Sequence, residues 1–173
     1  MVSSQTSLSF EKLCGSCKHQ NCCTNSQEPI LFSDDVEKLN SIGKNTPNFL
    51  QTISVKGTSV KAIKKKQDSQ ECVFWDNASG CSIYENRPFD CKVYPFDILK
   101  INGKYHWVVY SCNEESDWKW SEEYLKMLES DTSFENMLQN IDIFTNNTER
   151  ILPLESKKTP YKILREVKNN FTH

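Results

Sequence analysis

Eight cysteines are the residues of this 173-residue sequence that could do chemistry. Thiolates are soft ligands that select zinc, copper(I) or iron–sulfur clusters over hard cations such as magnesium and calcium. The sequence therefore predicts a metal centre with cysteine ligands. The candidate ligands form a compact N-terminal group and a dispersed group, namely Cys14, Cys17, Cys22 and Cys23, and then Cys72, Cys81, Cys91 and Cys112.

Spacing within the N-terminal group limits how its thiols can bind. Cys14 and Cys17 can bind one metal because a Cys-x-x-Cys turn points both sulfurs at a common centre, and Gly15 eases that turn. The adjacent side chains of Cys22 and Cys23 point apart, so both can hardly ligate one mononuclear ion. Either one ligates and the other packs, or the two serve different metals, or they share a polynuclear cluster.

The dispersed group lies around a predicted β-hairpin. Asn102-Gly103 separates two β-rich runs, Phe96–Ile101 and Lys104–Tyr110, and this pattern is typical of a two-residue hairpin turn. Cys72 and Cys81 flank a cluster of turn-forming residues, so we expect the chain to fold back between them.

The hairpin register predicts a neighbour for Cys91. If the ladder continued to Val93, that residue would lie opposite Cys112, and Cys91 and Cys112 would be diagonal neighbours about 7–8 Å apart. Pro95 cannot donate to the ladder, so a bulge there would change this pairing.

Caps and hydrophobic periodicity predict the remaining elements, since capping residues and proline mark helix starts and alternation marks strands. A strand is expected over Val60–Ile63. Helices are expected over Ser33–Gly43, from Thr46-Pro47 through Phe49, Leu50 and Ile53, from Ser121 through Leu128, from the capping box at Thr132 through Ile141, and from Thr159-Pro160 through Val167.

Together these elements predict an α+β fold, in which a small antiparallel β-hairpin core surrounds a cysteine–metal centre and short helices flank it. Residues 1–145 are expected to form the cysteine-cluster metal-binding domain. Residues 146–173 are expected to form a C-terminal extension, with a terminal helix packed on the same domain.

The cellular compartment of the protein determines whether its cysteines are expected to be metal ligands or disulfides. The first ten residues contain neither the basic nor the apolar region of a secretory signal, and no segment approaches the ~20 apolar residues of a membrane span. We therefore expect a cytoplasmic protein, in which thiols stay reduced. The eight cysteines are then interpreted as metal ligands or redox groups rather than as four disulfides.

Composition excludes other classes of partner. Apolar residues make up 37% of the chain, which is enough for a core. The 21 Lys and Arg residues are balanced by 23 Asp and Glu residues, for a net charge of −2. No concentrated positive field is present, so we expect neither a nucleic acid nor a membrane as partner.

Three cysteine motifs carry a resemblance to a known family. They are Cys14-x-x-Cys17-x4-Cys22-Cys23, then Cys72-Val-Phe-Trp75, then Cys81-Ser-Ile-Tyr-Glu-Asn-Arg-Pro-Phe-Asp-Cys91. Together they resemble the YkgJ-type cysteine-cluster family, whose domain is described as zinc- or iron-chelating. The resemblance covers residues 14–112, and the segment from Cys81 to Cys91 is its most specific part. The family signature is Cys-x-x-Cys-x-x-Cys-Cys, so two additional residues precede Cys22 here.

The resemblance implies a cysteine-bound metal centre. The family includes flagellin lysine N-methylases, which are associated with an iron–sulfur cluster, so it favours an iron–sulfur cluster, [4Fe–4S], over Zn²⁺. Four-cysteine sets alone suit either group. A methyl-transfer role is implied less directly, because only five glycines are present and none forms a glycine-rich loop for S-adenosylmethionine.

An enzyme and a non-enzyme hypothesis both follow. Under the first, the cluster has a redox or methyl-transfer role; under the second, structural zinc holds an interaction module that binds a protein partner without catalysis. A third hypothesis is metal delivery or storage. Arg87, between two candidate ligands, could offset the thiolate charge or hydrogen-bond a sulfur. The alternative for Arg87 is a surface ion pair with Glu85 or Asp90.

Overall fold

The chain combines helices with antiparallel strands, which confirms the predicted α+β class. The computed structural model describes residues 23, 28–42, 48–110, 118–144 and 161–168. The strands are β1 (Ile30–Leu31), β2 (Leu50–Val55), β3 (Thr58–Ile63), β4 (Trp75–Asp76), β5 (Gly80–Cys81), β6 (Phe96–Ile101), β7 (Lys104–Tyr110) and β8 (Tyr161–Glu166). The helices are α3 (Ser33–Ile42), the 3-10 helix η1 (Tyr84–Asn86), α4 (Phe89–Val93), α5 (Ser121–Glu129), α6 (Thr132–Gln139) and α7 (Ile141–Phe144).

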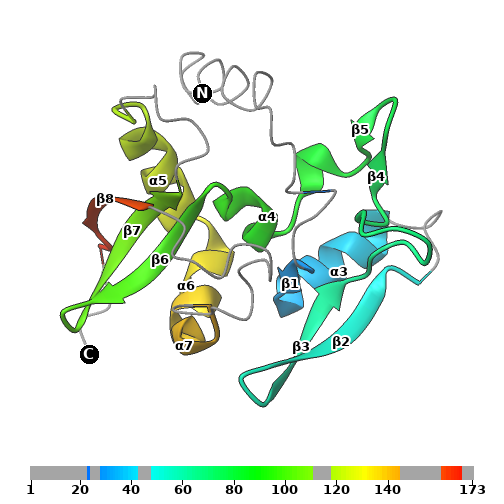
Figure 1. Ribbon diagram of the computed structural model, residues 1–173, viewed down its shortest axis with the longest axis horizontal. Helices are drawn as coiled ribbons and strands as arrows, with labels where there is room; N and C mark the ends of the chain where they lie inside the picture. Colours follow the sequence, from blue (N-terminus) through cyan, green and yellow to red (C-terminus); the bar gives the residue numbers. More distant parts are fainter. Residues whose placement is uncertain (1–22, 24–27, 43–47, 111–117, 145–160, 169–173) are drawn as a thin grey trace.

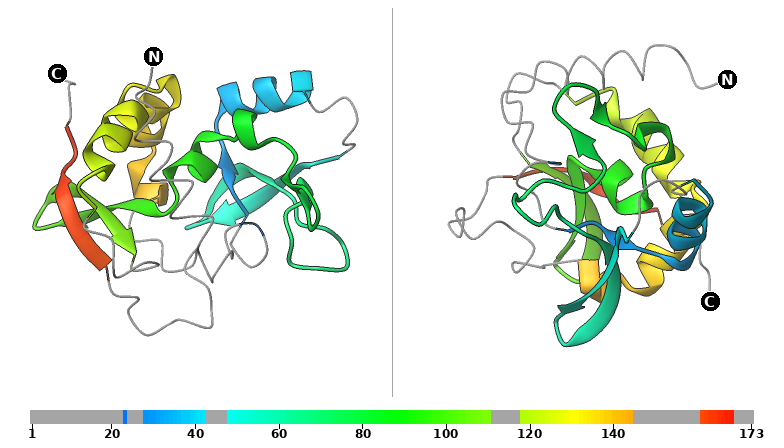
Figure 2. Two further views of the ribbon diagram at one scale, coloured as in Figure 1. Left: turned by 90° about the horizontal axis from the view of Figure 1, so that it is seen from above. Right: turned by 90° about the vertical axis from the view of Figure 1, so that its right-hand side faces the viewer.

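These elements form two groups with α4 between them (Figures 1 and 2). One group contains α3, the sheet of order β1-β3-β2 and the small β4-β5 pair. The other contains the sheet of order β6-β7-β8 with α5 to α7. Helix α4 follows the segment that contains Cys81 and itself carries Cys91, so these two cysteines lie on the part of the chain that joins the first group to the second.

The first sheet corrects one helix prediction. The segment after Thr46-Pro47 forms strand β2, not a helix, and pairs with β3 from Val55 opposite Thr58 onward. Lys56 and Gly57 both have positive φ, 49° and 81°, which is the conformation of the two-residue turn that joins twisted strands. This turn, which the sequence analysis missed, outweighs the Thr-Pro capping signal. The predicted strand near Val60–Ile63 is confirmed as β3.

The predicted hairpin is confirmed residue by residue. Ile101 pairs with Lys104, and the same register continues to Phe96 opposite Val109. Asn102 and Gly103 have φ values of 51° and 81°, so both occupy the left-handed region that asparagine and glycine tolerate.

Beyond Phe96 the predicted register is wrong. Val93 is the last residue of helix α4 and therefore has no place in the ladder, so it does not lie opposite Cys112. Pro88 precedes α4 in extended backbone (φ −60°, ψ 161°) and Pro95 follows it, and neither proline has an N–H to donate to a ladder. The distance between Cys91 and Cys112 stays a prediction, because Cys112 lies outside the described residues.

The C-terminal element is also a correction. Residues Tyr161–Glu166 form strand β8 rather than the predicted terminal helix, and β8 pairs antiparallel with β7, with a bulge where β7 passes from Trp107 to Val108. Arg165 on β8 binds Glu129 of α5 through two hydrogen bonds of 2.7 and 2.8 Å. Pairing with β7 and this ion pair outweigh the local Thr-Pro helix signal.

The predicted starts of α5 and α6 are confirmed at Ser121 and Thr132. The N-cap of α6 is Asp131 and not the predicted Thr132. The Asp131 carboxylate accepts a 3.0 Å hydrogen bond from the Ser133 amide. The predicted helix over Ser33–Gly43 is confirmed as α3. None of the helices in the described ranges is long and apolar enough to cross a membrane.

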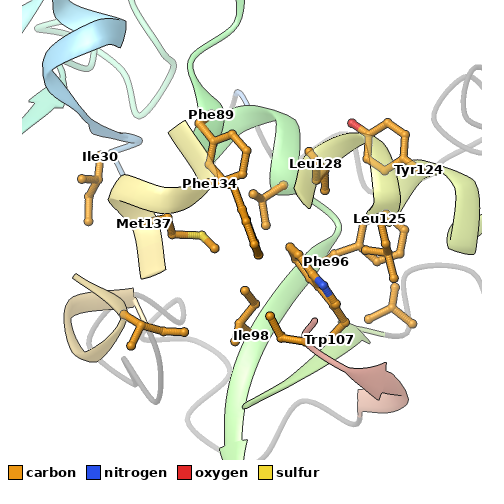
Figure 3. Packing of buried hydrophobic residues seen from close by; sticks show 14 of the residues in the cluster. Ile30, Phe89, Phe96, Ile98, Trp107, Tyr124, Leu125, Leu128, Phe134 and Met137 are labelled. Atoms are coloured by element: carbon orange, nitrogen blue, oxygen red, sulfur yellow. The ribbon is translucent and has the colours of Figure 1, made fainter. Parts of the chain in front are cut away.

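Two hydrophobic cores support the fold, and the larger one includes Ile30 and Val55 of the first group as well as residues of the second. In the larger one, the rings of Trp107 on β7 and Phe134 on α6 stack with centroids 5.9 Å apart (Figure 3). Phe89 of α4 enters the same core, 6.3 Å from the Phe134 ring. The smaller core contains Leu31, Leu39, Phe49, Ile63, Phe74 and Ile83. Full burial of one such side chain contributes roughly 1.5–3 kcal/mol, so these cores fix the segments that carry the cysteines.

Candidate metal centre

Half of the predicted ligands lie in the described part of the chain. Cys23, Cys72, Cys81 and Cys91 are not in disulfide bonds, and each is partly buried. The other predicted ligands, Cys14, Cys17, Cys22 and Cys112, lie outside the described residues.

Cys72 lies next to Cys23, the residue of the N-terminal cysteine group that the structure describes. Its backbone amide donates a 2.8 Å hydrogen bond to the carbonyl oxygen of Cys23. On its other side Cys72 forms an antiparallel bridge with Lys65, and the Val73 amide donates to the Lys64 carbonyl at 3.2 Å. Cys72 is thereby held between the segment that follows β3 and the backbone of Cys23.

Cys81 is brought towards Cys72 by a tight reversal of the chain. Strands β4 and β5 pair Trp75 with Cys81, and the Trp75 amide donates a 3.0 Å hydrogen bond to the Cys72 carbonyl. The carboxylate of Asp76 stabilises the reversal by accepting hydrogen bonds from the amides of Ala78 and Ser79 and from the Ser79 hydroxyl. This confirms the predicted fold-back between the two cysteines.

Cys91 is positioned by two carboxylates that the sequence analysis did not single out for this purpose. Buried Asp35 of α3 accepts 3.2 Å hydrogen bonds from the amides of Phe32 and Phe89, the latter at the start of α4. Burial raises the pKa of Asp35, against the lowering effect of these two hydrogen bonds. Asp90 accepts a 2.8 Å hydrogen bond from the amide of Ile30 on β1. The short helix that carries Cys91 is therefore fixed to both α3 and β1.

The thiols of Cys72, Cys81 and Cys91 affect one another electrostatically. Burial raises the pKa of Cys91 well above its usual range, and the charges of Asp90, Cys72 and Cys81 raise it further, while Arg87 lowers it. Burial likewise raises the pKa of Cys72; the Phe74 amide lowers it, Cys81 raises it and Lys66 lowers it. These thiols are protonated at neutral pH, so binding of a metal must release their protons.

Arg87 lies beside this thiol cluster, meaning Cys72, Cys81 and Cys91. Its guanidinium carbon is 3.8 Å from the centroid of the Tyr84 ring. Its Nε atom is buried and has no hydrogen-bond partner among the residues that the structure describes. A buried cationic donor of this kind fits an acceptor such as a thiolate or an inorganic sulfide.

Within the described ranges, no three His, Cys, Asp or Glu side chains are grouped so that they could hold a metal ion. The thiol cluster and Cys23 would therefore need further ligands to hold a metal, and the other predicted ligands are the cysteines outside those ranges. The donor chemistry nevertheless fits a soft metal, because every predicted ligand is a thiol and the buried cationic side chain of Arg87 acts on Cys91.

One comparison decides the family. The family model CxxCxxCC, described as “Putative zinc- or iron-chelating domain”, matches residues 13–123. The chain belongs to this family. The matched region of the CxxCxxCC family begins one residue before Cys14 and ends after Cys112, so it contains all eight cysteines. Membership supports chelation of zinc or iron by this chain, and it confirms the resemblance to the YkgJ-type cluster family.

The match also has a limit. It ends within α5, so α6, α7 and strand β8 lie outside the region that the family model covers. No curated protein and no solved structure matches the chain significantly.

Proposed function

We propose that this protein holds an iron–sulfur cluster, of the [4Fe–4S] type, on its cysteine thiolates. The observation that carries the proposal is the electrostatic coupling of Cys91 to Cys72 and Cys81, together with the backbone hydrogen bond that joins Cys72 to Cys23. The donor set from which the ligands would come is Cys14, Cys17, Cys22, Cys23, Cys72, Cys81, Cys91 and Cys112.

The donor set favours a polynuclear cluster over a single ion. The adjacent cysteines Cys22 and Cys23 can hardly ligate one mononuclear ion, but both can serve a cluster that offers more than one iron. When bound, such a cluster would supply one-electron transfer or an exposed iron site, which would serve a redox or a methyl-transfer role.

The chain itself would contribute position, burial and charge. Asp35 and Asp90 fix the helix that carries Cys91. Partial burial of the thiols limits access of water and oxidants, and Arg87 supplies a positive charge beside them. These are the contributions that tune an iron–sulfur centre without changing its ligands.

A structural zinc site in a non-catalytic interaction module is the second candidate. It is favoured by the small amount of regular structure around Cys72 and Cys81, where β4 and β5 have two residues each. Phe74 and Ile83 anchor these loops in the smaller core, and a metal would tie them together further. In this case the surface around the centre would bind a protein partner.

The two candidates differ in colour and metal content. The protein should be purified without oxygen and examined by visible absorption, electron paramagnetic resonance after reduction, and elemental analysis. Broad visible absorption with iron and acid-labile sulfide in equal amounts supports the cluster. A colourless protein with stoichiometric zinc contradicts it and supports the structural zinc site.

A further inference from the structure

Arg87 is fixed at a junction between two candidate ligands. It follows η1, where its amide donates a 3.4 Å hydrogen bond to the Tyr84 carbonyl. It precedes Pro88, whose extended backbone leads into α4 and Cys91. The backbone of Arg87 is therefore constrained on both sides, and its side chain starts four residues before a thiol of the cluster.

The guanidinium group of Arg87 is held by an aromatic face. Tyr84 is 42% exposed, and its ring lies 3.8 Å below the guanidinium carbon. Stacking of a planar cation on a ring face contributes roughly 0.5–2 kcal/mol and restricts the rotamers of both side chains. The Tyr84 ring thus fixes the direction of the arginine N–H groups.

One of these N–H groups is buried and has no acceptor among the described residues. The Nε atom is inaccessible to solvent. Leaving a buried donor unpaired costs about 1–3 kcal/mol, and more for a charged group. The ring stack and the backbone hold the Arg87 side chain in this position, where the unpaired N–H destabilises the protein. We therefore expect an acceptor to pair with this N–H in the complete site.

We propose that Arg87 donates its Nε hydrogen to a metal-bound sulfur of the centre that contains Cys91, and that Tyr84 holds it there. This inference rests on the proposed metal centre and adds a residue that controls its properties. A positive charge and a donor at the sulfur stabilise bound thiolate or sulfide. They stabilise a reduced cluster more than an oxidised one, because reduction adds negative charge.

The first experiment compares reduction potentials. We expect Arg87→Gln to lower the midpoint potential of the cluster. At a fixed solution potential, the ratio of oxidised to reduced cluster should rise about tenfold, which corresponds to about 59 mV for a one-electron couple. Arg87→Lys keeps the charge but loses the planar stack, so its shift should be smaller in the same direction. The matched control is Lys100→Gln, which removes a cation 5.4 Å from the Tyr105 ring on the hairpin. That variant should keep the wild-type potential.

Two further variants test the same contact if Arg87→Gln does not fold. If Arg87→Gln does not fold, Tyr84→Leu leaves the arginine in place without its platform and should lower the potential partway. Tyr84→Phe keeps the ring face and should match the wild type. Equal potentials in wild type, Arg87→Gln and Tyr84→Leu would overturn the assignment of Arg87 while leaving the cluster itself in place.

The outcome also separates this inference from the proposed function. If the wild-type protein is colourless and contains zinc, the iron–sulfur proposal is wrong and the role of Arg87 is measured by competition with a chelator. Arg87→Gln should then lose zinc about tenfold faster than wild type and Lys100→Gln. Equal rates of loss would overturn the sulfur contact of Arg87 for a zinc centre as well.

Discussion

The backbone amide of Cys72 donates a 2.8 Å hydrogen bond to the carbonyl oxygen of Cys23. This bond connects Cys23 of the N-terminal group to Cys72 of the dispersed group, and the two residues are 49 positions apart in the sequence. Cys72 is also coupled electrostatically to Cys81 and Cys91. Cys23 and Cys72 are therefore neighbours in space, so a metal bound at Cys23 would lie next to Cys72.

Single cysteine substitutions should test this neighbourhood. We expect Cys23→Ser and Cys91→Ser each to lower the metal bound per chain by at least half, although the two residues belong to different groups. A hydroxyl is a poor ligand for a soft metal, so each change removes one donor. Metal content by elemental analysis and thermal unfolding give the measurement. The same joint loss of metal and thermal stability is predicted for Cys17→Ser.

A serine next to a candidate ligand provides the control. Ser82 follows Cys81, and its hydroxyl donates a 3.2 Å hydrogen bond to the Phe74 carbonyl. Ser82→Ala perturbs the same loop without removing a thiol, so metal content should not change. If Cys81→Ser and Ser82→Ala retain equal amounts of metal, Cys81 does not belong to the ligand set.

A second prediction concerns the support of α4. Asp35→Asn should destabilise the fold by about 1–3 kcal/mol, because the amide has one oxygen where the carboxylate accepts from both Phe32 and Phe89. The neighbouring Asp34 is exposed and accepts a hydrogen bond from the Ser33 hydroxyl alone among the described residues. Asp34→Asn should therefore change stability by less than about 0.5 kcal/mol. Equal urea midpoints for the two variants would contradict the support role of Asp35.

Local signals in the sequence predicted part of this fold. The Asn102-Gly103 turn specifies its hairpin because both residues tolerate positive φ, and the register follows from a two-residue loop. The start of α5 at Ser121 is likewise specified by residues close to it in the sequence. The segments now seen as β2 and β8 have helix-like Thr-Pro starts, and they become strands because they pair with β3 and β7.

The candidate site was predictable to a similar extent. The turn formers between Cys72 and Cys81 indicated the fold-back, because they act within a few residues. The hydrogen bonds that position Cys91 join residues 54 and 60 positions apart, so no local pattern could identify Asp35 or Asp90 as its supports. The helix around Cys91 also escaped prediction, since five residues carry little periodicity.

A reciprocal exchange should test the two hairpin turns. Lys56 and Asn102 occupy equivalent positions, with φ values of 49° and 51°. Asparagine tolerates this left-handed conformation better than lysine, so Lys56→Asn should stabilise the protein and Asn102→Lys should destabilise it, each by roughly 0.5–1 kcal/mol. Urea unfolding of both variants measures this. Changes of the same sign in the two turns would contradict the turn assignment.

The last prediction concerns the pH dependence of stability through Glu129, which holds strand β8. Burial alone would raise the pKa of Glu129, but hydrogen bonds from Arg165 and Trp107 outweigh it and the pKa is lowered. Glu129→Gln should cost about 2–3 kcal/mol near pH 7, because hydrogen bonds to a charged group are lost. A lowered pKa gives stability that is present above the unfolded value of about 4.3 and is lost as pH falls through the folded value.

The difference in unfolding free energy between wild type and Glu129→Gln should therefore be constant from about pH 8 to pH 6 and should narrow below about pH 4. Exposed Glu123, which pairs with Lys126, gives the matched control. Glu123→Gln should differ from wild type by less than about 0.5 kcal/mol throughout. Urea unfolding across this range measures both differences. A gap for Glu129→Gln that is unchanged or wider at low pH would show that the ionised carboxylate does not hold β8.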